Sequence, residues 1–182
     1  MKEKELVEAT LGFLIKDNKV WLAIKTRNIG EGCWNGYGGG VEIEDKNIIE
    51  CLKREVKQEC EVKILEKAIE KVATIDFHNT KSDGETFVYK VHVFFIKDWE
   101  GEPKESEEMA TPTIFEINNL PLKDMMPADR EWLPLVLELV LEGKKLIAEY
   151  YYGPFQKELI KEGKLRIVKD LPNENSKEFK IH

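Results

Sequence analysis

A glycine loop followed by an acidic helix constrains this chain more than any other feature. The three glycines at residues 38–40 precede a segment from Asn47 to Cys60 whose apolar residues recur every three or four positions, as they do along one face of a helix. Glu55, Gln58 and Glu59 are three and four apart, so their side chains are neighbours beside that apolar stripe. Oxygen ligands of this kind favour Mg²⁺, and a glycine loop lets backbone approach closely. The pattern therefore predicts a cation held against a phosphorylated ligand.

The same acidic residues also fit a simpler interpretation, in which they only form ion pairs on a solvated helix surface. The partners available for Glu50, Glu55 and Glu59 are Lys46, Lys53, Arg54, Lys57 and Lys63. The order of loop and helix, and the short distance between them, favour the metal site over this alternative.

Strand-like and helical segments alternate along the chain. Strands are expected at residues 8–15, 20–26, 63–77, 86–96, 113–117, 145–152 and 165–168, and helices at 47–60 and about 128–143. A turn at Asp17-Asn18 joins the first two strands into a hairpin. Strands interrupted by two main helices predict an α+β fold, an α/β/α sandwich with a mixed sheet and helices on both faces. Residues 1–168 are expected to form a single domain and residues 169–182 a polar C-terminal tail.

Composition limits the partners and the compartment. A net charge of −7 argues against binding a nucleic-acid polymer, which needs a basic surface. No apolar run approaches the roughly 18 residues of a membrane helix, and the charged N-terminus lacks the features of a signal peptide. We expect a cytoplasmic protein without membrane contact, either a monomer or a homodimer. The three cysteines are expected to be buried or half-buried thiols, because they lack the number and spacing of a disulfide or zinc framework.

The loop and helix together resemble the Nudix box, G-x5-E-x7-R-E-U-x-E-E-x-G-U, in which U is aliphatic. The chain departs from it at four places. Asp45 stands at the first glutamate, one extra residue precedes Arg54-Glu55, Gln58 replaces a glutamate, and Glu61 replaces the closing glycine. We expect Asp45 to cap the helix, because aspartate is a good acceptor at such positions.

This resemblance implies specific roles for the loop and helix residues. The implied catalytic residues are Arg54, Glu55 and Glu59, with Arg54 orienting a carboxylate. The implied metal ligands are the Gly38 carbonyl and the side chains of Glu55, Gln58, Glu59 and Glu108. Mg²⁺ is the expected cofactor, with Mn²⁺ as the alternative. The Gln58 amide carries no charge and cannot act as a general base, so slower or metal-shifted activity is expected. The base is then another carboxylate or a water activated by the metal.

Resemblance extends over about residues 8–152 to the MutT-homologue branch of the family, which hydrolyses oxidised purine nucleoside triphosphates such as 8-oxo-dGTP and 2-hydroxy-dATP. Residues 34–39, W-N-G-Y-G-G, are similar to the branch's W-N-G-F-G-G, and residues 91–94 match its V-H-V-F. Residues 105–109 also match. Residues 120–127, L-P-L-K-D-M-M-P, resemble its I-P-F-K-D-M-W-P.

The branch also implies a base-binding pocket. Its expected residues are Thr10, Lys25, Asn35, Phe77, Met126, Asp129 and Trp132. Asn35 and Asp129 would read the base edge, and the aromatic and thioether side chains would form the walls. Each aromatic residue also fits ordinary core packing, and Asn35 fits a turn. The branch has two acids where this chain has only Asp129, and Ile29 and Met126 replace aromatic residues, so preference for an oxidised base is less well supported than hydrolysis of a purine nucleotide.

The sequence thus predicts Mg²⁺-dependent hydrolysis of purine (deoxy)nucleoside triphosphates, including oxidised ones, to a monophosphate and pyrophosphate. The partner is a small-molecule nucleotide. The alternative is a nucleotide-binding or sensor module of the same fold whose catalysis is weakened by Gln58 and the stretched box. A third interpretation is a related hydrolase of another diphosphate, such as a dinucleotide or a nucleotide sugar.

Overall fold

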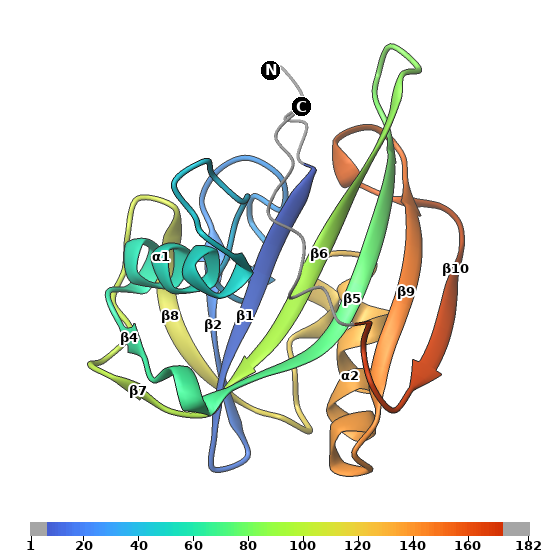
Figure 1. Cartoon of the computed structure of the whole chain (residues 1–182). Helices are drawn as coiled ribbons and strands as arrows, with labels where there is room; N and C mark the ends of the chain where they lie inside the picture. Colours follow the sequence, from blue (N-terminus) through green and yellow to red (C-terminus); the bar gives the residue numbers. More distant parts are fainter. Residues whose placement is uncertain (1–6, 173–182) are drawn as a thin grey trace.

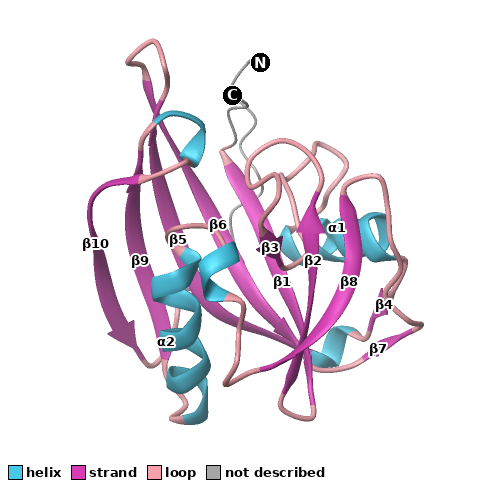
Figure 2. Cartoon of the chain, turned by 180° about the vertical axis from the view of Figure 1, so that it is seen from behind, coloured by secondary structure: helices cyan, strands magenta, loops and turns pink. Residues whose placement is uncertain are grey.

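A mixed sheet with one helix on each face forms the protein (Figures 1 and 2). The computed structural model describes residues 7–172, so most of the expected C-terminal tail lies outside the described part. The strands are β1 (Glu8–Lys16), β2 (Lys19–Lys25), β3 (Trp34–Asn35), β4 (Lys63–Ile64), β5 (Ile69–Thr80), β6 (Thr86–Ile96), β7 (Trp99–Glu100), β8 (Met109–Glu116), β9 (Lys145–Tyr152) and β10 (Leu159–Val168). The helices are α1 (Ile48–Cys60) and α2 (Asp129–Leu141), with 3₁₀ turns η1 (Glu66–Ala68), η2 (Leu122–Asp124) and η3 (Pro154–Gln156).

The main sheet has the order β10-β9-β5-β6-β1-β2-β3, and β8 also pairs with β2. The pairs β1–β6 and β5–β9 are parallel, and the remaining pairs are antiparallel. Seen from opposite sides, α1 covers the sheet near β1, β2 and β8, whereas α2 covers the other face near β5 and β9. The predicted α/β/α sandwich is therefore confirmed.

Alternation along β6 divides the core into two parts. Val91, Val93 and Phe95 belong to the cluster under α2, and Phe94 and Ile96 belong to the cluster under α1. Successive residues of a strand point to opposite faces, so one apolar run supplies both layers. This arrangement fixes the two helices on opposite sides of the strands that carry the candidate site.

The predicted hairpin between β1 and β2 is present. Asp17 and Asn18 both have positive φ, 52° and 62°, and Lys16 pairs with Lys19 across the turn. A two-residue turn with both central residues left-handed matches the twist of the paired strands, and Asp and Asn tolerate that conformation. The three cysteines are free, with Cys51 and Cys60 buried and Cys33 half-buried, as expected.

The largest differences from the predicted strands concern three segments. The expected strand at 63–77 is split into β4 and β5 by the η1 turn, and β8 begins at Met109, four residues before the predicted start. The expected strand at 165–168 is only the second part of β10. β10 alternates poorly because it pairs with β9 alone at the edge of the sheet, so its exposed residues hide its length in the sequence. Among residues 7–172, no helix has the length and apolar character needed to cross a membrane.

Candidate active site

The residue that caps the start of helix α1 suits its position well, whereas the residue that ends the helix suits its position poorly. Asn47 is the N-cap, and its side-chain oxygen accepts hydrogen bonds from the N–H groups of Ile49 and Glu50, both at 3.0 Å. At the other end Glu61 adopts the left-handed conformation, with φ 64°, and its N–H donates to the Lys57 carbonyl. Glycine is the usual residue there, so Glu61 occupies the closing position of the box at a cost of about 1 kcal/mol.

The expected capping role of Asp45 is wrong, because Asn47 occupies the cap. Asp45 instead binds Arg54: Arg54 Nε lies 2.9 Å from Asp45 Oδ1, and Arg54 Nη2 lies 2.7 Å from Asp45 Oδ2. The Glu42 N–H also donates to Asp45 Oδ2. This ion pair lowers the pKa of Asp45. The loop between the glycines and α1 therefore folds back onto the helix, and the extra residue of the stretched box lies between these two partners.

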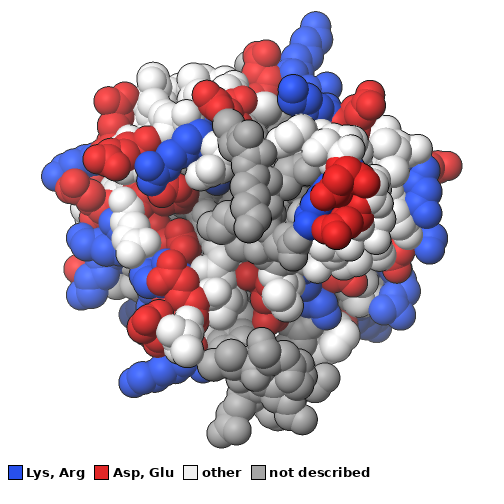
Figure 3. Space-filling view, turned by 90° about the horizontal axis from the view of Figure 1, so that it is seen from above, with Lys and Arg blue, Asp and Glu red and all other residues white. Residues whose placement is uncertain are grey.

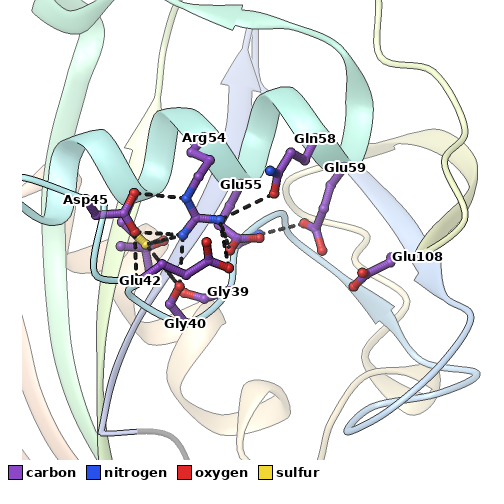
Figure 4. Close-up of polar contacts among 12 residues, drawn as sticks. Gly39, Gly40, Glu42, Asp45, Arg54, Glu55, Gln58, Glu59 and Glu108 are labelled. Carbon is purple, nitrogen blue, oxygen red and sulfur yellow. Dashed lines mark hydrogen bonds and ion pairs between the residues drawn. The ribbon is translucent and has the colours of Figure 1, made fainter.

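Arg54 connects the loop to the acidic residues of α1 (Figure 4). Besides Asp45, its guanidinium donates to Glu55 Oε1 at 2.6 Å and to the Gly40 carbonyl at 3.0 Å. A longer bond of 3.3 Å reaches Gln58 Oε1. A planar guanidinium with several donors can hold these groups at once, so Arg54 fixes the position of the Glu55 carboxylate. Gln58 itself is exposed.

The glycine loop lies directly against these carboxylates. A methyl group built on Gly39 would stand 2.6 Å from the Glu55 carboxylate carbon, and one built on Gly38 would stand 2.1 Å from the Thr10 carbonyl oxygen. The Gly38 N–H donates to Glu59 Oε2 at 2.7 Å. Glycine is therefore needed at both positions, because any side chain would displace either the strand β1 or the Glu55 carboxylate.

Burial and mutual repulsion disfavour the charged forms of the helix carboxylates. Burial raises the pKa of Glu59 to about 7, and the nearby charges of Glu55 and Glu108 add to this effect while Lys25 opposes it. Burial also raises the pKa of Glu55, against the opposing effect of Arg54. In Figure 4 the carboxylates of Glu55, Glu59 and Glu108 point toward a common region beside α1. Acidic groups gathered in this way are stabilised by a cation.

The donor set fits a hard divalent cation, although the side chains are not arranged around one. Within residues 7–172, no three carboxylate, thiol or imidazole side chains form a ready metal-binding group. Glu108 forms an ion pair with Arg27, Glu55 is held by Arg54, and Glu59 accepts the Gly38 N–H. Carboxylate and amide oxygens of this kind are the ligands that Mg²⁺ prefers. A cation would need Glu108 to turn away from Arg27.

A narrow cavity of about 120 Å³ adjoins the glycine loop. Six of the seven predicted pocket residues line it, namely Thr10, Lys25, Asn35, Phe77, Met126 and Asp129. Gly38 and Gly39 also border it. Through Met126 and Gln156 it adjoins a wider depression of about 770 Å³. The structure thus brings together residues that are more than 100 positions apart in the sequence.

The seventh predicted residue, Trp132, lies behind the cavity and is not part of its wall. It is fully buried, packs edge-on against Phe13, and its Nε1–H donates to Asp129 Oδ1 at 2.9 Å. Burial raises the pKa of Asp129 to about 7, and the bond from Trp132 opposes that shift. Trp132 therefore holds the carboxyl group that faces the cavity.

Several lining residues were not predicted from the sequence, and those with polar side chains are Tyr89, Tyr152 and Gln156. Tyr89 lies on β6 in the same alternation as Val91 and Val93, which signals the face that it occupies. Gln156 lies in the η3 turn, and no pattern in the sequence points to it.

Charged groups of both signs are interspersed over the face of the protein seen from above (Figure 3). This surface is consistent with the small negative net charge per residue of the chain. An anionic ligand at the candidate site would therefore depend on local cationic groups such as Lys25.

Comparison with known proteins relates this geometry to characterised ones. The NUDIX domain family model matches residues 6–136. The chain is 35% identical over 163 residues to a Danio rerio protein named oxidized purine nucleoside triphosphate hydrolase, covering 89% of this chain and 96% of that protein. It is also 35% identical over 129 residues to the Mus musculus protein of the same name, covering 71% and 78%. The crystal structure of a Bacillus halodurans MutT protein shares the fold, with a TM-score of 0.70 and 23% identity over 88% of this chain and 97% of that one.

Proposed function

Because the chain belongs to the Nudix family of hydrolases, we propose that it hydrolyses purine (deoxy)nucleoside triphosphates to a monophosphate and pyrophosphate with Mg²⁺. Oxidised bases, such as those of 8-oxo-dGTP and 2-hydroxy-dATP, are the proposed preference. The curated relatives from Danio rerio and Mus musculus carry names that refer to oxidised purine nucleoside triphosphates. We further propose that the protein works in the cytoplasm on free nucleotides.

One observation carries this proposal: the same glycine loop borders both the acidic helix and the cavity. Gly38 donates its N–H to Glu59, and both Gly38 and Gly39 line the cavity that contains Asn35 and Asp129. A purine in that cavity would project its phosphates along the loop toward the carboxylates. In this proposal, base recognition and phosphate chemistry would occur at adjoining places on one short segment.

The residues of α1 and the β7–β8 loop are the proposed holders of the cation. Glu55, Glu59 and Glu108 would supply carboxylate oxygens, with the Gly38 carbonyl and the exposed Gln58 amide as further ligands. Bound there, Mg²⁺ would neutralise phosphate charge and lower the pKa of a water molecule. Before a cation binds, Glu108 is held in an ion pair with Arg27, and Glu55 in an ion pair with Arg54.

Two charged side chains, Lys25 and Glu59, would act on the phosphates and on the cation. Lys25 lines the cavity and acts electrostatically on Glu59, so its ammonium group is placed to attract a phosphate. Glu59 Oε2 accepts the Gly38 N–H, which leaves Oε1 as the oxygen that would face a cation. Burial raises the pKa of Glu59 to about 7 without a cation, and a bound cation would lower it and so favour the carboxylate form that binds the metal.

The test is a substrate panel. Purified protein is incubated with normal and oxidised dNTPs and with Mg²⁺ or Mn²⁺, and pyrophosphate release is measured beside a Glu59→Gln variant. We expect the wild type to release pyrophosphate from purine substrates, with a higher kcat/KM for oxidised ones, and the variant to release none. Release no greater than that of the variant would exclude the proposed activity.

A second candidate function is a nucleotide-binding or sensor module with weak catalysis. Gln58 favours it, because its amide oxygen faces Arg54 and lacks the charge that a glutamate would give the metal site. This candidate predicts thermal stabilisation by nucleotides without turnover, and a gain of hydrolysis in the Gln58→Glu variant. Efficient hydrolysis by the wild type would exclude it.

A further inference from the structure

Three buried polar side chains form a hydrogen-bonded network beside the cavity. Asn79 from β5, Tyr89 from β6 and Gln156 from the η3 turn are each less than 10% exposed. Gln156 Nε2 lies 2.6 Å from Asn79 Oδ1 and 2.8 Å from the Tyr89 hydroxyl oxygen. Tyr89 and Gln156 line the cavity, whereas Asn79 stands behind them. Gln156 also lies beyond residues 6–136, so the family match assigns it no role.

The hydrogen bonds fix which way the Gln156 amide points. Asn79 Nδ2 lies 2.8 Å from the Phe77 backbone carbonyl, which can only accept, so Asn79 must direct its NH₂ there and its oxygen toward Gln156. The Asn79 oxygen in turn requires the NH₂ of Gln156. Gln156 Oε1 is consequently a fixed acceptor, because a flipped amide would place two oxygen atoms together inside the protein.

The Tyr89 hydroxyl is a hydrogen-bond donor beside this acceptor. Its oxygen accepts from Gln156 Nε2, so its hydrogen is left to donate. Within the network the nearest acceptor for that hydrogen is Gln156 Oε1 at 3.2 Å, which is long for an O–H···O bond. A ligand oxygen in the cavity would be a better acceptor. Tyr89 and Gln156, which both line the cavity, therefore hold one donor, the Tyr89 O–H, beside one acceptor, Gln156 Oε1.

The backbone is strained where it presents Gln156. Phe155 and Gln156 both have positive φ, 57° and 54°, although neither is glycine. Two consecutive left-handed L-residues are costly and persist where the surrounding structure holds them. Here the strain turns Gln156 inward, so that it is buried between the exposed Phe155 and the exposed Lys157.

We propose that Tyr89 and Gln156 are specificity-determining residues that recognise the N7–H and C8=O of an 8-oxopurine, with Asn79 as the residue that positions the Gln156 amide. This inference rests on the proposed function and names the base feature that the site selects. An unmodified purine has a lone pair at N7 and a hydrogen on C8, so it would set its N7 against Gln156 Oε1 and leave the Tyr89 hydrogen without an acceptor. Asn35 and Asp129, which line the same cavity, remain for the other edge of the base.

The test measures binding without turnover, so that it stands apart from the proposed activity. Dissociation constants for 8-oxo-dGMP and dGMP are measured by titration calorimetry on the full-length wild type and on variants. The wild type is expected to bind 8-oxo-dGMP at least tenfold more tightly. Tyr89→Phe should weaken 8-oxo-dGMP binding about five- to tenfold and change dGMP binding less than twofold, since one hydrogen bond is lost.

Two further variants separate recognition from packing. Tyr150→Phe removes a hydroxyl from another tyrosine that stacks on Phe77 but does not line the cavity, so its binding ratio should equal that of the wild type. Asn79→Ala frees the Gln156 amide to flip and offer N–H to N7, so dGMP binding should tighten relative to 8-oxo-dGMP binding. Thermal unfolding of each variant shows whether it folds. If Asn79→Ala does not fold, the binding ratio of Tyr89→Phe still decides the test.

Equal binding of the two monophosphates by the wild type would overturn the inference, and so would equal weakening of both in Tyr89→Phe. Neither result bears on whether triphosphates are hydrolysed. Conversely, a preserved binding ratio in a protein that releases no pyrophosphate would remove the proposed activity and keep the recognition of the base.

Discussion

The contact between Asp45 and Arg54 gives the most direct test of how the stretched loop supports the acidic helix. The Asp45 side chain is 4% exposed and that of Arg54 is 20% exposed, and two hydrogen bonds join them. Asp45→Asn keeps the size of the side chain but removes its charge and one acceptor. Its new NH₂ group would face the donors of Arg54 and the Glu42 N–H.

The expected loss follows from this geometry. Removing one partner of a fully buried ion pair costs about 3–5 kcal/mol. Arg54 keeps Glu55 and the Gly40 carbonyl as partners and is partly exposed, so its charge is not stranded. We therefore expect Asp45→Asn to lower the free energy of unfolding by about 2 kcal/mol. Because Arg54 also orients Glu55, kcat/KM should fall by about 10–100-fold, as for other partners of metal ligands.

Asn47→Ala is the matched control, since Asn47 caps the same helix two residues later. Loss of the cap should cost about 1 kcal/mol and leave kcat/KM nearly unchanged. Urea unfolding at pH 7 and pyrophosphate release measure the two quantities. If Asp45→Asn matched Asn47→Ala in both, Asp45 would act only at the start of the helix and the reasoning about Arg54 would be refuted.

The pH dependence gives an independent check. The pKa of Asp45 is lowered in the folded protein, so the stability that it contributes is present above its unfolded pKa of about 3.8 and is lost as the pH falls through the folded value. The difference in unfolding free energy between wild type and Asp45→Asn should therefore shrink in strong acid. A difference that stayed constant down to pH 2 would contradict an ionic contribution.

Three other perturbations have defined outcomes. Gly39→Ala should push the Glu55 side chain aside and weaken Mn²⁺ binding roughly tenfold in titration calorimetry, while changing the free energy of unfolding by less than about 1 kcal/mol. Unchanged Mn²⁺ binding would mean that Glu55 is not a ligand. Burial raises the pKa of Asp129 to about 7, so the free energy of unfolding should fall as the pH rises from about 4 to about 7. In urea titrations Asp129→Asn should reduce this fall by roughly 2 kcal/mol, because the N-terminus of α2 offsets part of the cost of burying the charge. Trp132→Phe should destabilise the protein by about 1–3 kcal/mol at pH 8 and less at pH 5, where Asp129 is protonated; equal losses at both pH values would argue against this hydrogen bond.

Local patterns were enough to predict much of the fold. The β1–β2 hairpin follows from two apolar runs around Asp17-Asn18, and α1 follows from the spacing of Leu52, Val56 and Cys60. These signals depend on residues only a few positions apart. The break between β4 and β5 and the length of β10 depend on which strands lie beside them, and a single strand does not reveal its neighbours.

The error over Asp45 has a specific physical cause. Asp45 and Asn47 are both good N-cap residues and stand close to the predicted helix start, so sequence alone does not choose between them. The choice is made by Arg54, nine residues after Asp45, whose guanidinium takes the carboxylate and leaves the neutral amide of Asn47 for the helix N–H groups. The convergence of loop and carboxylates could be predicted, but the network that holds it could not.

The two halves of the candidate site differ in how far apart their residues lie along the chain. Most of the expected cation ligands lie between Gly38 and Glu59, so one loop and one helix fix them. The cavity takes Thr10 from β1, Tyr89 from β6, Asp129 from α2 and Gln156 from a strained turn after β9, and only the sheet order brings these together. We therefore expect a substitution at Tyr89 or Gln156 to change base selectivity without moving the carboxylates. Base selectivity should accordingly be the property that sequence resemblance to the family predicts least well.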